Sequence, residues 1–196
     1  NIRNELLGSD IIVAAIGIPK FVTADMVKTG APFYTMFAIG DYTFAPYKVV
    51  WTRVAIDIKA ALINSLKTQL IEKVIIPVET ATMVSFGYLQ EALYFCGMIN
   101  SSPFRFSVIS YSVDSTGGFG SPHILNRVKI PKYDNRNTTH KILLERSQRA
   151  HDLALKNDYN SIVSIESEID ELAAKIWGLT SEELKEIQLS LKELLV

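Results

Sequence analysis

The stretch that most constrains the fold covers residues 91–131, because a helix- or strand-breaking residue stands at each of its junctions. It predicts an apolar helix that ends at the polar corner 100–102, whose Asn and Ser side chains can cap helix ends. Pro103 suits the first position of a second helix. Three glycines and a proline in residues 115–122 stop that helix, since they favour open backbone. The cations and apolar residues that alternate near the end of 123–130 predict a half-buried strand with one charged face.

Three earlier segments have the composition of β-strands. Residues 10–21 form an apolar run that ends at a glycine and a proline. Residues 33–39 and 43–58 are rich in aromatic and β-branched side chains, which strands favour. The dipeptide Gly40-Asp41 between them is a hairpin-type signal.

The third of these segments predicts one core face. Side chains alternate across a strand, so Tyr47, Val49 and Trp51 point one way, and we expect Trp51 in the core. Lys48 and Arg53 fall on opposite faces if the strand is regular.

Together the segments predict an α+β fold. Residues 55–70 fit either a strand or a helix, and we favour a strand followed by a short helix or loop; residues 74–84 return to a β pattern. We expect a mixed β-sheet target-recognition domain over residues 1–134 and a C-terminal helical region over 135–196. The boundary falls in a polar linker.

Three helices are predicted after the linker. The first is capped by Thr138 or Thr139 and runs to about Lys156. The second has an apolar seam at alternating spacings of three and four and stops at Gly178; the seam is formed by Ile162, Ile165, Ile169, Leu172 and Ile176. The third begins with a capping box at Thr180 and Glu183; its apolar stripe is formed by Leu184, Ile187, Leu191 and Leu194.

Charge is distributed unevenly. The net charge is −1, which argues against a general nucleic-acid binder. Between residues 123 and 151, however, seven basic side chains stand against two acidic ones. Such a window suits a phosphate-facing edge or a solvated basic surface.

Three stretches resemble a known family. The helix, glycine loop and strand of residues 91–131, the segment YTFAPYKVVW at 42–51 and the segment IDELAAKIWGLT at 169–180 occur in the family's order. They resemble the target-recognition (specificity) domain of N6-adenine DNA methyltransferases and of TaqI-like restriction-modification enzymes. More distantly they resemble the specificity subunits of type I restriction systems. The resemblance covers roughly residues 33–191.

The resemblance implies sequence-specific recognition of double-stranded DNA. Methyltransferases of this group need a glycine-rich cofactor loop and an Asn/Asp-Pro-Pro-aromatic loop, and the chain contains neither. It would therefore be the specificity domain alone, with no cofactor and no catalytic residues of its own. S-adenosylmethionine and the methyltransferase catalytic domain would belong to a longer parent protein. The chain begins at Asn1 rather than at methionine, and we expect a fragment.

Charge and loop position suggest which residues touch DNA. Basic side chains would contact phosphates, while loop and strand-end residues would read base edges in the major groove. The glycine loop 115–120 can alternatively be a phosphate cradle or a plain connector. The expected DNA contacts are Lys48, Arg53, Ser115, Thr116, Gly118, His123, Arg127, Lys129 and Lys132.

Other chemistry has weaker support. Asp41 with Asp57 and Lys59 has a nuclease-like spacing, but such triplets are common by chance. Arg105 is more often a structural arginine stacked on aromatic rings than a base reader. Cys96 lies among apolar residues and is expected to be a buried thiol.

A second function remains open. The C-terminal helices can pair with a partner subunit or a second copy, without direct DNA reading. The single cysteine makes the cytoplasm the default compartment. No apolar run approaches the roughly 20 residues that span a bilayer, so no membrane partner is expected.

Overall fold

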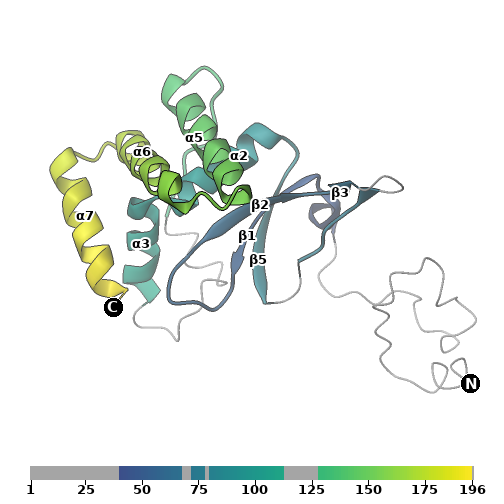
Figure 1. Ribbon diagram of the computed structural model, residues 1–196, viewed down its shortest axis with the longest axis horizontal. Helices are drawn as coiled ribbons and strands as arrows, with labels where there is room; N and C mark the ends of the chain where they lie inside the picture. Colours follow the sequence, from purple (N-terminus) through teal and green to yellow (C-terminus); the bar gives the residue numbers. More distant parts are fainter. Residues whose placement is uncertain (1–39, 68–71, 78–79, 113–127, 196) are drawn as a thin grey trace, which may run out of the picture. The chain divides into compact units, whose positions relative to one another are not determined.

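The structure is a computed structural model that describes residues 40–67, 72–77, 80–112 and 128–195. These residues belong to one compact unit, Gly40–Val196 (Figure 1). The expectations for residues 10–21 and 33–39 lie outside the described residues. The predicted boundary at residue 134 falls within this unit, because the helices that follow it pack on those that precede it.

A three-stranded antiparallel sheet forms the β part, with strand order β2-β1-β5. Its strands are β1 (Tyr47–Thr52), β2 (Ala60–Asn64) and β5 (Ala81–Phe86). The short strands β3 (Leu66–Lys67) and β4 (Glu72–Lys73) pair separately. In the main sheet Val49 pairs with Leu62 on one side and with Val84 on the other, so the apolar side chains of three strands share one face.

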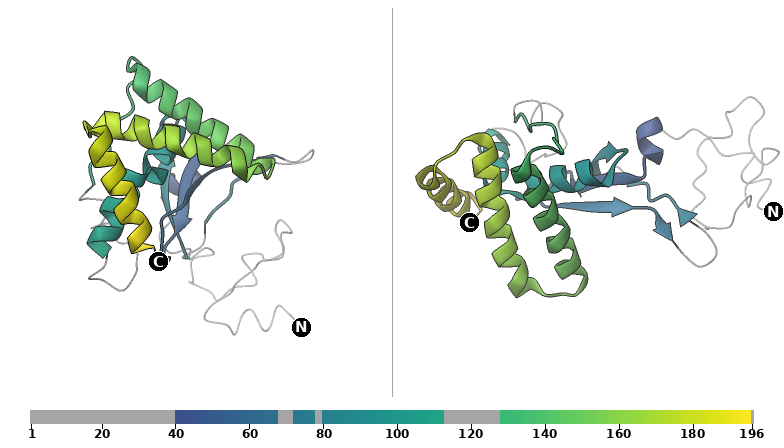
Figure 2. Two further views of the ribbon diagram at one scale, coloured as in Figure 1. Left: turned by 60° about the vertical axis from the view of Figure 1, so that its left-hand side comes forward. Right: turned by 90° about the horizontal axis from the view of Figure 1, so that it is seen from above.

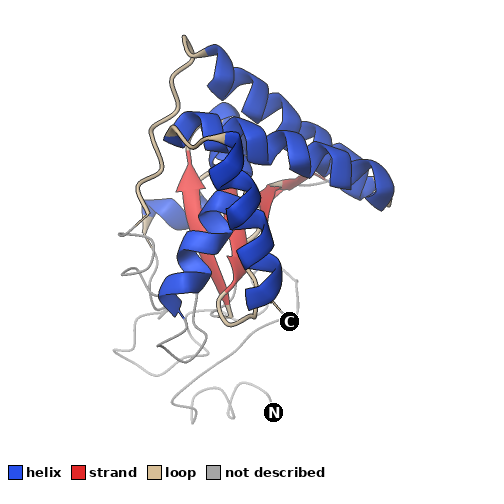
Figure 3. Ribbon diagram, turned by 90° about the vertical axis from the view of Figure 1, so that its left-hand side faces the viewer, coloured by secondary structure: helices blue, strands red, loops and turns tan. Residues whose placement is uncertain are grey.

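The helices gather over that face of the sheet (Figures 2 and 3). They are α2 (Leu89–Asn100), α3 (Ser102–Ser112), α5 (Thr138–Leu155), α6 (Tyr159–Trp177) and α7 (Ser181–Leu194). The α+β class is confirmed. Trp51 is 2% exposed, which confirms its place in the core.

Two apolar clusters share helix α2. In the first, Val49 and Trp51 of β1 pack with residues of α2, α3 and α7, among them Phe104. In the second, Tyr94 and Met98 on another side of α2 pack against α5 and α6. The stretch predicted to constrain the fold therefore supplies the central helix, because α2 is buried on both sides.

Local residue patterns predict some of the element boundaries correctly and others wrongly. Gly178 adopts a left-handed φ of 72° and ends α6, and Thr180 and Glu183 form the predicted capping box of α7. Asn137, rather than either threonine, caps α5. The predicted strand 43–58 is wrong at both ends, because Asp41–Phe44 forms the 3-10 helix η2 and β1 ends at Thr52.

A buried carboxylate joins three helices. Asp170 of α6 is 7% exposed and accepts hydrogen bonds from the Ser102 backbone N–H and hydroxyl, both at 2.6 Å. It also accepts a bond of 2.8 Å from the Gln188 amide of α7. The first turn of α3 thus receives its acceptor from a side chain 68 residues away.

Replacing Asp170 with alanine tests this junction. The change leaves the Ser102 donors without their acceptor, and a buried unsatisfied donor costs about 1–3 kcal/mol. We expect the free energy of unfolding to fall by about that amount in urea denaturation. Glu171→Ala, at the exposed neighbouring position, should stay within about 0.5 kcal/mol. Equal stability of the two variants would contradict the capping role.

Close packing of α2 on α5 depends on Gly97. A Cβ at this position would lie 2.7 Å from Leu143 Cδ2 and 3.2 Å from Ser147 Cβ. Gly97→Ala should therefore lower the melting temperature, because overpacking costs about 1–3 kcal/mol and the gain in helix propensity is only about 1 kcal/mol. The control is Gly87→Ala, where a Cβ meets nothing within 4 Å. A Gly97→Ala protein as stable as the control would contradict this role, because it would show that α2 and α5 can move apart without loss of stability.

Candidate nucleic-acid interface

The predicted DNA contacts divide into three groups. Lys129 and Lys132 are exposed on one irregular segment, and Arg53 is exposed just after β1. Lys48 is buried. The remaining predicted contacts lie outside the described residues; they are Ser115, Thr116, Gly118, His123 and Arg127.

Lys48 serves the fold. Its side chain is 3% exposed, and its ammonium group donates a hydrogen bond of 2.8 Å to the Ala45 carbonyl. Burial lowers the pKa of this lysine. Its charge is therefore held inside the unit, and this placement does not suit the predicted phosphate contact.

The segment 128–133 is irregular and pairs with no strand among the described residues. The strand predicted for 123–130 is wrong for residues 128–130, which form no strand. The predicted alternation is nevertheless present: Val128 and Ile130 pack against the core, while Lys129 is exposed. Instead of a neighbouring strand, the Trp177 indole N–H holds the segment by donating to the Lys129 carbonyl at 3.1 Å.

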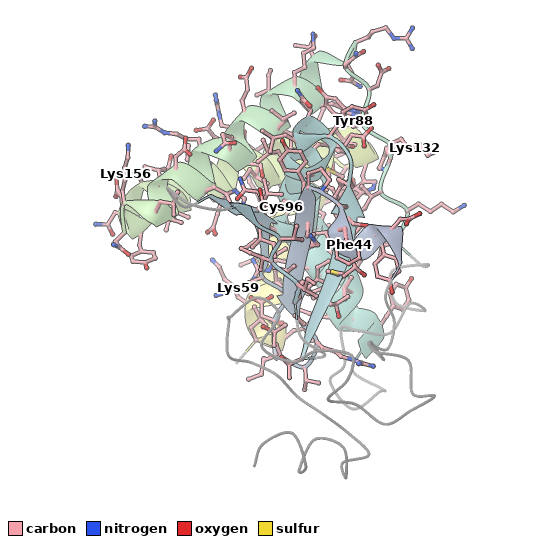
Figure 4. All side chains as sticks on the ribbon, turned by 90° about the vertical axis from the view of Figure 1, so that its right-hand side faces the viewer. Phe44, Lys59, Tyr88, Cys96, Lys132 and Lys156 are labelled. Atoms are coloured by element: carbon pink, nitrogen blue, oxygen red, sulfur yellow. The ribbon has the colours of Figure 1, made fainter. Side chains whose placement is uncertain are left out.

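A groove of about 750 Å³ lies at the C-terminal end of this segment, between the first turn of α2 and the turn at 134–136. Tyr88, just before α2, is 70% exposed at its rim. Figure 4 shows Tyr88 and Lys132 toward one side of the unit, with Lys59 and Lys156 toward the opposite side. The groove is lined by Tyr88, Gln90, Glu91, Tyr133, Asp134, Asn135 and Arg136.

The turn that forms one wall of the groove is fixed by hydrogen bonds. The Asp134 carboxylate accepts the Arg136 backbone N–H at 2.9 Å, and this bond holds the Asp134 pKa below its ordinary value. The Asp134 N–H donates to His140 Nδ1 at 3.1 Å. Burial lowers the pKa of His140 and so favours the neutral ring that this bond requires. Asn137 then caps α5 by accepting the Thr139 N–H at 2.9 Å.

One of the nuclease-like residues, Asp57, has a structural use. Arg105 of α3 makes a two-pronged ion pair with Asp57, with distances of 2.9 and 2.5 Å. Arg105 is structural as predicted, but its observed partner is a carboxylate where aromatic rings were expected. In the described part of the chain, no group of three or more His, Cys, Asp or Glu residues could hold a metal ion.

Two side chains missed by sequence reasoning protect the edge of the sheet. Asn100 exchanges two hydrogen bonds of 2.8 Å with the backbone of Ala60, as a neighbouring strand would. His151 Nε2 accepts the Leu62 N–H at 3.0 Å. Free strand edges invite pairing with other chains, so these contacts block it. His151 lies 89 residues from Leu62, and no local pattern could reveal the contact.

Cys96 lies beneath this edge. It is fully buried, and its sulfur lies 3.6 Å from the Ala60 carbonyl and 3.9 Å from His151 Nε2. Burial raises the pKa of the thiol to about 12. The predicted buried thiol is confirmed, and the surroundings favour its protonated form.

Comparison with known proteins adds no relative. No family model matches the chain, and no curated protein or solved structure is significantly similar to it. Over the described residues, none of the helices is long and apolar enough to cross a membrane. Because the comparisons supply no relative, the functional assignment depends on the residues and on the order of their motifs.

Thiol labelling tests the burial of Cys96. Because the reactive species is the thiolate, an aromatic disulfide reagent at pH 8 should label the native protein far more slowly than the protein in urea. The colour released in each condition measures the rate. Equal rates with and without urea would contradict the closed edge and its buried thiol.

Proposed function

We propose that this chain recognises double-stranded DNA in a sequence-specific way. It would be the specificity domain of an N6-adenine DNA methyltransferase or restriction-modification enzyme. The ordered resemblance of residues 42–51, 91–131 and 169–180 supports the proposal. The observation that carries it is the pair of exposed cations, Lys129 and Lys132, on a segment whose backbone is fixed by the core.

Fixed cations suit phosphate contacts. Val128 and Ile130 anchor the segment, so Lys129 projects from a backbone that does not need to be ordered on binding. Phosphate contacts set the register of a protein on the duplex and carry no sequence information. Since the net charge of the chain is −1, such binding depends on this local surface.

The catalytic functions would lie elsewhere in the parent protein. With no cofactor loop and no adenine-gripping motif in its sequence, the chain itself would transfer no methyl group. S-adenosylmethionine would bind to the catalytic domain. The free, buried Cys96 agrees with the cytoplasm as the compartment.

A protein-interaction role is the second candidate. The inner faces of α6 and α7 are committed to their own unit, since Ile169, Leu184 and Leu191 are buried there. Exposed apolar side chains remain where α5 meets α6: Leu155 is 84% exposed and Val163 is 67% exposed. A partner subunit would therefore use this end of the helix pair.

Charge neutralisation tests DNA binding. Lys129→Gln with Lys132→Gln should weaken binding to every duplex alike, because each lysine would contact phosphate. The log–log slope of affinity against salt should fall by about 0.9 for each phosphate that is no longer neutralised. Fluorescence anisotropy at several salt concentrations measures both quantities.

The matched control is Lys59→Gln with Lys156→Gln, which removes two exposed charges from the opposite side of the unit (Figure 4). The control should keep the wild-type slope. Identical slopes for both double variants would reject the interface. Absence of DNA binding by the wild-type chain, together with self-association in sedimentation, would instead favour the interaction role.

A further inference from the structure

The groove between α2 and the 134–136 turn presents polar side chains that the fold does not use. Gln90 and Glu91 are exposed in the first turn of α2, and Asn135 is exposed in the turn opposite. Among the described residues, none of these three side chains has a hydrogen-bond or ion-pair partner. Their polar groups bond to neither wall of the groove and remain available to a ligand.

Both walls of the groove are anchored by contacts with the core. Most residues of α2 from Ala92 to Ile99 are buried, so the first turn of the helix continues into a segment held by the core. On the other wall, the Tyr133 ring packs against Tyr94 with 5.6 Å between ring centroids, and His140 holds Asp134. Side chains presented from rigid elements lose little conformational entropy on binding.

Charge decides what the groove can accept. Glu91 and Asp134 bring two carboxylates to it, whereas Arg136 brings one guanidinium, which pairs with Asp134 at 3.4 Å. A phosphate would meet net negative charge there. The edges of base pairs are uncharged, and their amino groups can donate hydrogen bonds to a carboxylate or an amide oxygen.

The three side chains match particular base edges. A Gln or Asn amide can accept a hydrogen bond from adenine N6 while it donates one to N7. A Glu carboxylate can accept a hydrogen bond from cytosine N4. Lys132 lies toward the same side of the unit as Tyr88, which stands at the rim of the groove (Figure 4). Phosphate contacts by Lys132 would therefore place the groove against the duplex.

We propose that Gln90, Glu91 and Asn135 read base edges in the major groove, with preference for the amino groups of adenine and cytosine. This inference rests on the proposed DNA-binding function and assigns its sequence preference to specific residues. It differs from the sequence-based expectation, which placed base reading in the glycine loop and at strand ends.

Selection from a random duplex pool tests the assignment with the full chain. The wild type should enrich one sequence. Gln90→Ala, Glu91→Ala and Asn135→Ala should each lose preference at one position of it. Each should bind the wild-type sequence about 5- to 150-fold more weakly, the reduction expected when one base pair is no longer read, and random DNA within about twofold of wild type.

Controls of matched residue type are Glu145→Ala and Asn160→Ala, at exposed positions of α5 and α6 outside the groove. They should select the wild-type sequence. If the three groove variants also select it with wild-type affinity, base reading by the groove is overturned while DNA recognition stands. If the wild-type chain binds no duplex at all, the proposed function itself fails.

Discussion

The structure depends most on one buried carboxylate. Asp170 completes the first turn of α3, lies within α6 and receives the Gln188 amide of α7, so a single side chain sets the relative positions of three helices. Buried charge is costly unless it is fully hydrogen-bonded. Its donors here are the N–H and hydroxyl groups at a helix N-terminus, where negative charge is favoured. This cost is offset only when α3, α6 and α7 are packed together, so the carboxylate favours this one arrangement of the helices.

The geometry of the candidate interface depends on the helix positions that this junction fixes. Helix α6 ends at Trp177, whose indole N–H holds the Lys129 carbonyl. A shift of α6 would therefore move the backbone that carries Lys129 and Lys132. Further along the same segment, His140 of α5 fixes the turn at Asp134. The surface proposed to bind DNA is thus an irregular segment made rigid by two helices, and the proposed base readers lie where the segment meets α2.

Sequence reasoning succeeded where the determinants are local. The seam of α6, the glycine that ends it and the capping box of α7 each depend on neighbours within a few residues, and all were predicted. It failed at 128–130, because alternation requires one buried face and one exposed face but does not require a partner strand. Lys48 shows the same limit. Its position on β1 was predicted, whereas its bond to the Ala45 carbonyl depends on how the chain enters the strand. Contacts such as His151 with Leu62 join distant residues and leave no local signal.

The central claim is that DNA lies against the 128–137 segment and the first turn of α2. The most direct measurement is a titration of the ¹⁵N-labelled chain with its selected duplex, followed by the chemical shifts of the backbone amides. The account predicts the largest changes at 128–137 and at 88–91, and small changes at 155–163, where α5 meets α6. The largest changes at 155–163, with 128–137 unchanged, would contradict it.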